Sequence, residues 1–292
     1  MTAGVMDGKA LAAEIKARLA QETQMMKGAG IQPKLATILV GDDAPSKVYL
    51  GGKHRAAQEI GLGTENYHLP GTSPAGDLAL LIKRLNSDKS VNGILLQLPL
   101  PSHLDPRTSI ELISPDKDVD GLTSANMGKL FYNQAVLVPC TPKGVMELLR
   151  HYKVPLAGRR CVVVNRSALV GKPLMHLLLH EDATVTICHS KTADFLSVTR
   201  QADVLITAVG RRPDFTLTRD MVKEGAVVVD VAMNRLHGKL VGDADYDDVA
   251  SKASLITPVP GGVGPMTVTM LMENTLVAAA LQNGLKGGGV AK

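Results

Sequence analysis

A buried strand, a polar turn and the start of a helix follow one another in CVVVNRSALVGKP, residues 161–173. The apolar, β-branched run predicts a fully buried strand, and we expect a helix from around Pro173, because proline at a helix start loses no needed donor. Backbone N–H groups at such a helix start favour an anion. The turn lacks the GxGxxG spelling, so a plain structural turn is the alternative.

Similar units repeat on both sides of this stretch, with strands about 20 residues apart, a spacing that suits βα units. In the second half of the chain we expect strands at 161–164, 184–188, 204–210 and 226–231. In the first half we expect strands at 35–41, 65–69 and 93–101. Helical periodicity is found at 7–28, 46–60, 76–85, 141–150 and 266–281. The alternation predicts an α/β fold with parallel sheets covered by helices.

The chain has 292 residues, more than one domain usually holds, so two domains are expected. We place the first domain at residues 1–140 with 268–292. The second domain is placed at 141–267. The last predicted helix is long enough to return from the second domain to the first.

Composition excludes several classes of protein. With no Trp, three Phe and five Tyr, the chain lacks aromatic platforms for nucleic-acid stacking. Its net charge of +4 is a mild excess that suits small anionic ligands. No apolar stretch approaches the roughly 20 residues of a membrane span. The three cysteines lack metal-ligand spacing, which indicates a reducing compartment and no metal site. Taken with the other features of the composition, this predicts a cytoplasmic protein with no nucleic-acid and no membrane partner.

The residues after the strand at 184–188 indicate which dinucleotide is bound. NAD sites usually carry an acid there, whereas NADP sites offer cations and hydroxyls to the 2′-phosphate. This chain has His189, Ser190, Lys191 and Thr192, and Arg166 lies on the neighbouring turn. The pattern favours NADP, and a solvated polar loop is the alternative.

Tyr49 and Lys53 are four residues apart on a predicted helix, so both side chains project from one face. A tyrosine packed on a lysine stem at the surface would give the same pattern. Gly51 and Gly52 lie between them, although each glycine costs a helix roughly 1 kcal/mol relative to alanine. Either something approaches the helix closely there, or the helix is broken.

Three further segments are candidates for a site. Gln97 stands near the end of a predicted strand, where open α/β sheets bind ligands. PDKDVDG, residues 115–121, lacks the EF-hand spacing and so does not predict a calcium site. TPVPGGVGPMT, residues 257–267, is a dense Pro/Gly loop, which by itself is more typical of a rigid turn than of a site.

Together these segments resemble the bifunctional methylenetetrahydrofolate dehydrogenase/methenyltetrahydrofolate cyclohydrolase family, from about Asp7 to about Leu281. The motifs that carry the resemblance are VGDDAPSKVYLGGK (40–53), GILLQLPLP (93–101), PDKDVDG, PCTPKG (139–144), NRSALVGKP (165–173), TVTICHSKT (184–192) and ITPVPGGVGPMT (256–267). The resemblance implies two α/β domains flanking a cleft, the second one Rossmann-like, in a homodimer. It also implies NADP-dependent oxidation of 5,10-methylenetetrahydrofolate to the methenyl form, followed by hydrolysis to 10-formyltetrahydrofolate.

The resemblance also implies roles for individual residues. Lys53 is the central catalytic residue, Gln97 holds it, Tyr49 lies along the folate, and Asp120 binds the pterin amino edge. Residues implied at the substrate are Tyr49, Lys53, Gln97, Leu98, Pro99, Asp120, Pro260, Gly261 and Gly262. Residues implied at the cofactor are Asn165, Arg166, Ser167, His189, Ser190, Ala232 and Met233.

Two positions depart from the family pattern, because Asn165 and Ala232 each stand where the family usually has glycine. Asparagine tolerates a left-handed conformation, whereas alanine does not. We therefore expect these changes to affect the dehydrogenase activity more than the cyclohydrolase activity. A protein with one of the two activities, or a non-catalytic nucleotide-binding module, is the alternative.

Overall fold

The structure is a computed structural model that describes residues 3–285. It divides into two compact units: unit 1 comprises Met1–Ala13 with Thr141–Thr267, and unit 2 comprises Glu14–Cys140 with Val268–Lys292. The described N-terminal residues fall in a different unit from the one expected. Strand β1 (Gly4–Val5) pairs in parallel with β11 (Leu255–Ile256), so residues 3–13 group with unit 1. The last residues of the expected catalytic domain, 286–292, lie outside the described part.

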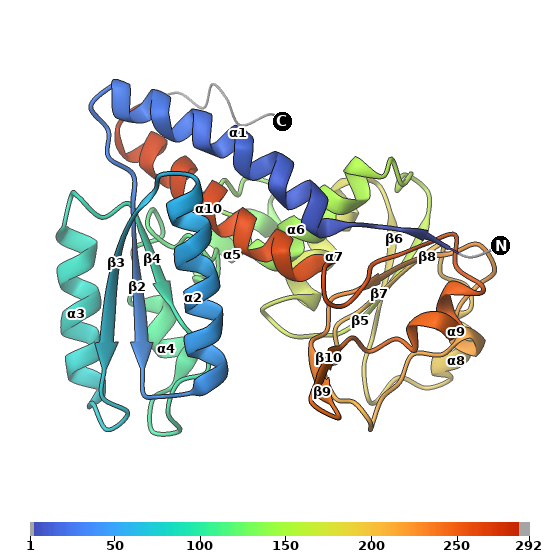
Figure 1. Ribbon diagram of the computed structural model, residues 1–292. Helices are drawn as coiled ribbons and strands as arrows, with labels where there is room; N and C mark the ends of the chain where they lie inside the picture. The colour runs from blue at the N-terminus through green and yellow to red at the C-terminus, as the bar shows by residue number, and fades with distance from the viewer. Residues whose placement is uncertain (1–2, 286–292) are drawn as a thin grey trace. The chain divides into compact units, whose positions relative to one another are not determined.

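Unit 1 is built on a parallel six-stranded sheet with the order β1-β11-β8-β7-β5-β6. Its central strands are β5 (Arg160–Val164), β6 (Thr184–Cys188), β7 (Val204–Thr207) and β8 (Val227–Asp230). Helices α6 (Cys140–His151), α7 (Gly171–His180), α8 (Phe195–Thr199) and α9 (Tyr246–Ala250) accompany them. Since β6 and β7 flank β5 on opposite sides, the strand order reverses at β5 (Figure 1), and ligands bind open α/β sheets at such a point.

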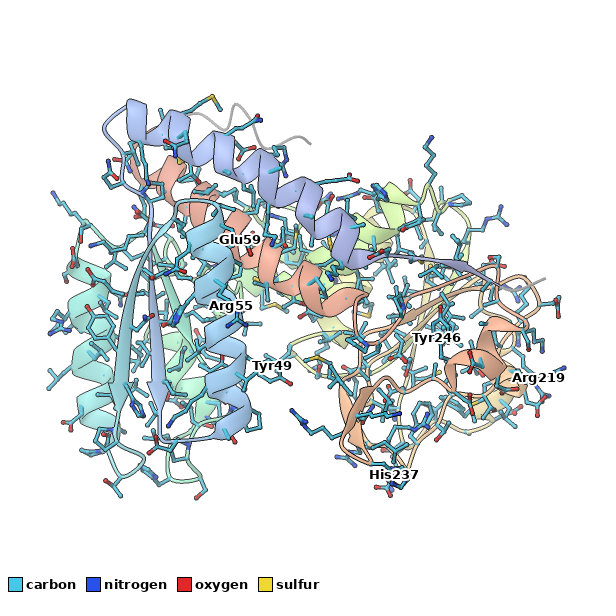
Figure 2. All side chains as sticks on the ribbon, viewed as in Figure 1. Tyr49, Arg55, Glu59, Arg219, His237 and Tyr246 are labelled. Carbon is cyan, nitrogen blue, oxygen red and sulfur yellow. The ribbon has the colours of Figure 1, made fainter. Side chains whose placement is uncertain are left out.

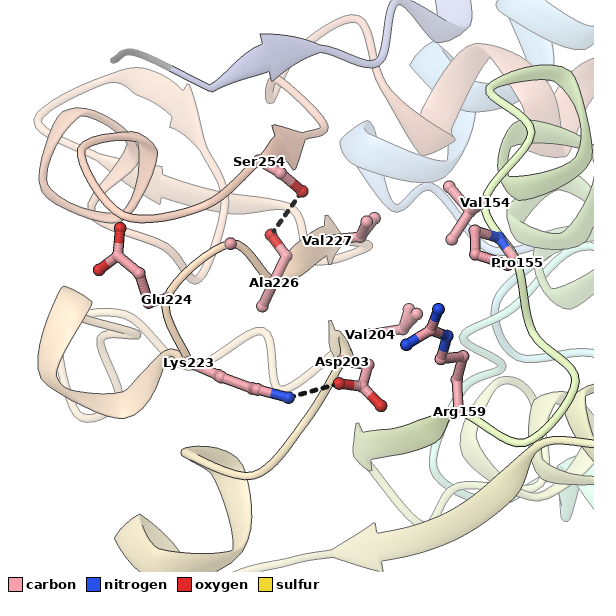
Figure 3. A pocket seen from close by; sticks show the side chains of 11 residues that line it. Val154, Pro155, Arg159, Asp203, Val204, Lys223, Glu224, Ala226, Val227 and Ser254 are labelled. Carbon is pink, nitrogen blue, oxygen red and sulfur yellow. Dashed lines mark hydrogen bonds and ion pairs between the residues drawn. The ribbon is translucent and has the colours of Figure 1, made fainter.

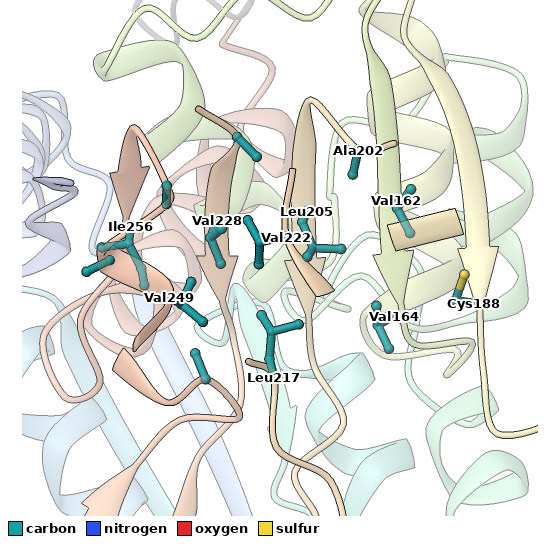
Figure 4. Close-up of a cluster of buried hydrophobic side chains, with 14 residues drawn as sticks. Val162, Val164, Cys188, Ala202, Leu205, Leu217, Val222, Val228, Val249 and Ile256 are labelled. Atoms are coloured by element: carbon teal, nitrogen blue, oxygen red, sulfur yellow. The ribbon is translucent and has the colours of Figure 1, made fainter. Parts of the chain in front are cut away.

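The core of unit 1 is aliphatic. Val162, Leu205 and Val228 come from neighbouring strands and are at most 3% exposed, and they pack with side chains that follow the sheet (Figure 4). Strands buried on both faces read as continuous β-branched runs. The sequence therefore predicted these strands, but it missed short elements with weak patterns: 3-10 helix η1 (Arg219–Met221) and the hairpin β9 (Asn234–Leu236) and β10 (Lys239–Val241).

Unit 2 holds a parallel three-stranded sheet with the order β3-β2-β4. The strands are β2 (Lys34–Val40), β3 (Gly63–Leu69) and β4 (Gly93–Leu96), and the helices are α2 (Ala44–Glu59), α3 (Ala75–Ser87), α4 (Pro106–Glu111) and α5 (Ser124–Phe131). The unit boundaries fall inside two long helices, α1 (Gly8–Gly28) and α10 (Val263–Gln282). Strand β4 is shorter than the predicted 93–101, because the prolines after Gln97 cannot donate to a ladder.

Helix α2 starts at a side-chain cap and continues through its two glycines. The Asp43 carboxylate accepts the Ser46 N–H at 2.9 Å. A Cβ added at Gly51 or Gly52 would meet only the Arg55 guanidinium, at 3.7 Å and 4.0 Å. Of the two readings left open by the sequence, a broken helix and a close approach, neither holds within the described residues.

We expect Gly51→Ala and Gly52→Ala to stabilise the protein by about 0.5–1 kcal/mol each, because the new methyl groups fit and the unfolded chain loses freedom. Gly121→Ala is the matched opposite. Gly121 has φ +70° and an added Cβ would lie 2.7 Å from backbone atoms of Val138 and Pro139, so this change should destabilise by more than about 1 kcal/mol. Urea unfolding measures the change in unfolding free energy for all three variants. A change of the same sign in all of them would contradict these expectations.

Two buried carboxyl groups lie at the carboxyl end of the unit 1 sheet, one of them on Asp230, the last residue of β8. Asp243 accepts the Thr207 hydroxyl and the Val209 N–H, both at 2.7 Å. Asp230 accepts the N–H groups of Ala232 and Ala244 at 3.1 Å and 2.8 Å. Burial raises the pKa of Asp230 to about 6, against the backbone hydrogen bonds, which lower it.

This raised pKa predicts a pH dependence of stability. Between about pH 4 and pH 6 the folded state keeps the Asp230 proton and the unfolded state has lost it, so the free energy of unfolding falls by up to about 3 kcal/mol as pH rises. Asp230→Asn should remove this slope, and the exposed-site variant Asp220→Asn should keep it. Urea unfolding at several pH values tests both, and an unchanged slope in Asp230→Asn would refute the assignment.

Candidate active site

Lys53 and Gln97 meet at the carboxyl edge of the unit 2 sheet. Lys53 lies on α2, which follows β2, and Gln97 directly follows β4. The Lys53 Nζ donates to Gln97 Oε1 at 2.9 Å, and Gln97 Nε2 donates to the Leu98 carbonyl at 2.6 Å. The two bonds fix which way the Gln97 amide faces, so its oxygen is presented to the lysine.

Asp120 comes to the same place from the segment after β4. Its loop is tied to β4 by the Ile94 N–H, which donates to the Lys117 carbonyl at 2.8 Å. Burial lowers the pKa of Lys53, and the Asp120 carboxylate and Cys140 oppose that shift. Burial likewise raises the pKa of Asp120, and Lys53 opposes it. Both groups are thus pushed towards their neutral forms by desolvation.

This arrangement suits proton transfer. A lysine amine acts as a base near neutral pH only when its ammonium form is disfavoured. Here burial supplies that effect, and a neutral amide rather than a carboxylate accepts the hydrogen bond from Lys53. Lys53 can therefore take a proton from a group that enters the site.

Tyr49 stands one helical turn before Lys53, and its side chain is 41% exposed, projecting from α2 (Figure 2). A ring in this position is free to lie against a ligand. Leu98 and Pro99 follow Gln97 and are joined by a cis peptide bond. Tyr49, Lys53, Gln97, Leu98, Pro99 and Asp120 all belong to unit 2, and Lys53 interacts there with Gln97 and Asp120.

Sequence reasoning missed His54, the residue after Lys53. Its Nε2 lies 3.2 Å from the Thr37 hydroxyl, which donates its one proton to Asn66 Oδ1 at 2.8 Å. His54 must therefore donate from Nε2. Burial, followed by the charge of Lys53, lowers the pKa of His54, so a second cation beside Lys53 is disfavoured.

The candidate cofactor residues leave the unit 1 sheet at one edge. In the β5–β6 pair Val164 lies opposite Cys188, so Arg166 and Ser190 each stand two residues past paired strand ends. Arg166 and Ser190 are exposed. His189 Nδ1 accepts the Lys191 N–H at 3.1 Å, which leaves its Nε2 for a ligand.

Asn165 spans the point where the strand order reverses. Its Oδ1 accepts the N–H groups of Ser167 at 2.7 Å and Gly171 at 3.1 Å, and its Nδ2 donates to the Ala208 carbonyl at 2.6 Å. Helix α7 therefore begins at Gly171, earlier than predicted, with its first N–H bonded to Asn165. Ser167 Oγ in turn accepts the Val170 N–H at 3.1 Å.

Neither of the two departures from the family pattern strains the backbone. Among the described residues, those with positive φ do not include Asn165 or Ala232, so the expected need for a left-handed conformation at these positions does not arise. Ala232 and Met233 follow β8, and Met233 is 46% exposed. Gly171 is the glycine that the turn requires, because an added Cβ would lie 2.1 Å from the Asn165 carbonyl oxygen.

The loop with Pro260, Gly261 and Gly262 belongs to unit 1, where it follows β11 and leads into α10. The Gly261 carbonyl accepts the Lys9 N–H at 2.8 Å, and a Cβ added at Gly8 would lie 2.0 Å from the Gly262 oxygen. The residues predicted to bind substrate therefore divide between the two units, with this loop on the unit that carries the candidate cofactor residues.

A hollow of about 320 Å³ lies at the opposite, amino-terminal edge of the unit 1 sheet (Figure 3). It is lined by Arg159 and by the ion pair of Lys223 with Asp203, 2.6 Å apart. None of the predicted site residues lines it. Within residues 3–285 no three or more His, Cys, Asp or Glu side chains are grouped to hold a metal ion, and no helix there has the length and apolarity of a membrane span.

Comparisons with known proteins match two sequence models of one family to this chain. The sequence model described as "Tetrahydrofolate dehydrogenase/cyclohydrolase, catalytic domain" matches residues 6–120, and the corresponding "NAD(P)-binding domain" model matches residues 139–283. A relative called "Bifunctional protein FolD", from Nitrosopumilus maritimus, is 52% identical over 283 residues, which cover 97% of this chain and 99% of the relative.

Solved structures give the same result. The bifunctional methylenetetrahydrofolate dehydrogenase/cyclohydrolase of Campylobacter jejuni superposes with a TM-score of 0.92 at 47% identity, covering 95% of this chain and 98% of the other. The enzyme of Trypanosoma brucei, solved with NADP cofactor and inhibitor, gives a TM-score of 0.91 at 37% identity, covering 96% and 98%. The chain belongs to the tetrahydrofolate dehydrogenase/cyclohydrolase family.

Proposed function

We propose that this protein oxidises 5,10-methylenetetrahydrofolate to the methenyl form with NADP and then hydrolyses that product to 10-formyltetrahydrofolate. The observation that carries the proposal is the 2.9 Å bond between Lys53 and Gln97 beside Asp120, in a chain that matches both domains of the family. The name of the Campylobacter jejuni relative states both activities.

Lys53 is the proton acceptor of the hydrolytic step. Water adds to the methenyl carbon and one of its protons passes to the Lys53 amine. The bond from that carbon to N5 then breaks as the remaining hydroxyl proton passes to N5, which leaves an N5–H and the formyl group on N10. Gln97 holds the amine in place, and burial lowers the pKa of Lys53, which favours its action as a base. The Asp120 carboxylate suits two parallel hydrogen bonds from the amino edge of a pterin.

NADP supplies the hydride acceptor. The residues of unit 1 fit a phosphorylated dinucleotide, since Arg166 and Ser190 leave neighbouring strand ends and the loop after β6 carries no acid before Asp194. We assign the 2′-phosphate to Arg166, Ser167, His189 and Ser190. Asn165, Ala232 and Met233 would hold the remainder of the cofactor, and Pro260, Gly261, Gly262, Leu98 and Pro99 would line the substrate.

The family resemblance also supports a homodimer located in the cytoplasm. The three cysteines are buried and form no disulfide among the described residues, which fits a reducing compartment. Sedimentation equilibrium should give twice the chain mass, and a monomer at micromolar concentration would refute the dimer.

Lys53→Met should lower the rate of methenyl hydrolysis by about a hundredfold or more, because the proton acceptor is lost. The matched control is Lys47→Met on the same helix, where the lysine is exposed and pairs with Asp42 at 2.5 Å. Separate assays of NADP reduction and methenyl hydrolysis measure both proteins. Wild-type hydrolysis in Lys53→Met would exclude the role of Lys53, and wild-type protein that lacks one of the two reactions would show that only one activity is retained.

Arg166→Ala should weaken NADP binding by about tenfold or more while changing NAD binding little, because a charge-assisted bond to the 2′-phosphate contributes about 1.5–3 kcal/mol. Arg159→Ala, at the opposite edge of the same sheet, is the control and should bind both dinucleotides as the wild type does. Calorimetry measures the dissociation constants. Equal losses for NADP and NAD in Arg166→Ala would contradict the 2′-phosphate assignment.

A further inference from the structure

Asn274 is a polar residue in the most buried stretch of α10. From Thr269 to Ala279 every residue of this helix is buried, and Asn274 is 0% exposed. Its carboxamide Nδ2 donates to the Val119 carbonyl at 2.9 Å and to the Val138 carbonyl at 2.8 Å. Burying an amide costs free energy unless its hydrogen bonds are made. The two bonds from Asn274 are therefore expected to persist, and they hold both carbonyls against α10.

The two carbonyls belong to the segments that face Lys53. Val119 immediately precedes Asp120, and Val138 lies two residues before Cys140. The Cys140 thiol donates to the same Val119 carbonyl at 3.3 Å, and Asn274 Nδ2 lies 3.7 Å from the Cys140 sulfur. One side chain on α10 therefore joins the Asp120 loop to the start of α6.

These two segments also pack directly against each other. Gly121 permits the approach, since an added Cβ would lie 2.7 Å from backbone atoms of Val138 and Pro139. On the other side of the loop, Asp118 accepts the Thr123 N–H at 2.8 Å and the Asn126 amide at 2.9 Å. The Asp120 loop is thus held at both ends, and Asn274 bonds the carbonyl of Val119, the residue that precedes Asp120.

We propose that Asn274 is a positioning residue for the Lys53 site, which sets the place of Asp120 and Cys140 relative to the Lys53 amine. The inference rests on the proposed function, because it assigns Asn274 to the hydrolysis that Lys53 assists. Asn274 acts through the backbone of Val119 and Val138 and not on the substrate itself.

The charged and titratable groups around Lys53 give the expected direction. Asp120 and Cys140 face it from the neighbouring segments, Asp118 acts on Asp120, and His54 adjoins it on α2. Asp120 and Cys140 raise the pKa of Lys53, against the larger effect of burial. If the segments that carry Asp120 and Cys140 move away from Lys53, these two groups raise its pKa less. The pKa of Lys53 then falls.

The test compares Asn274→Leu, which removes the amide at similar size, with Asn274→Ser, which keeps one donor. For Asn274→Leu we expect the hydrolysis kcat/KM to drop about tenfold to a hundredfold, since misplacements of about 1 Å can cost that much. The inflection of the pH–rate profile assigned to Lys53 should shift to lower pH. Asn274→Ser should recover part of both effects.

Thr275→Val is the matched control, because Thr275 is also fully buried on α10 and its hydroxyl bonds only within the helix, to the Leu271 carbonyl at 2.8 Å. It should lose stability but keep the wild-type pH profile. NADP binding, measured by calorimetry, should stay unchanged in all variants and shows that unit 1 is folded.

A wild-type pH profile and kcat/KM in Asn274→Leu would overturn the inference, and so would an equal shift of the pH profile in Thr275→Val. If Asn274→Leu does not fold, Asn274→Ser decides by the same two readouts. Wild-type protein without hydrolysis would instead refute the proposed function, so the two failures are distinguishable.

Discussion

The Lys53 amine is partly buried, and it donates to the neutral amide of Gln97 rather than to a carboxylate. Desolvation disfavours an ammonium group, and an amide oxygen compensates for that less than a carboxylate would. Asp120 lies close enough to act on Lys53 through its charge, and it limits how far the pKa of Lys53 falls. The proposed proton transfer depends on this balance, because a lysine in a full ion pair would stay protonated and could not accept a proton from water.

The parallel sheets explain how distant residues reach their places. Strands that run in one direction end at one edge, so residues far apart in the sequence gather there. In unit 2 this edge brings Gln97 beside α2, and in unit 1 it brings the loops after β5 and β6 next to each other. In unit 1, Asn165 links the ends of β5 and β7, the pair at which the strand order reverses.

The sequence predicted much of this arrangement because buried parallel strands have a simple pattern. Apolar runs such as CVVV (161–164) and VLIT (204–207) suit strands that are buried on both faces, and the resemblance to the family named Lys53, Gln97 and Asp120. The place of residues 3–13 was missed because β1 has only two residues, and so short a strand has no periodicity to detect. Asn274 was missed for a different reason: a single polar residue in an apolar helix reads as a weak exception, and its partners are backbone carbonyls from segments more than 130 residues away.

In both units, side-chain amides connect chain segments at the candidate sites through hydrogen bonds, and their chemistry suits this role. An amide both donates and accepts, so Gln97 can present its oxygen to Lys53 while its nitrogen bonds the Leu98 carbonyl. Asn165 likewise binds two N–H groups and a carbonyl. An aspartate in either place could not donate and would add a charge, which beside Lys53 would favour the ammonium form. Neutral amides thus join segments of the chain in buried surroundings and leave the charge of the site to Lys53 and Asp120.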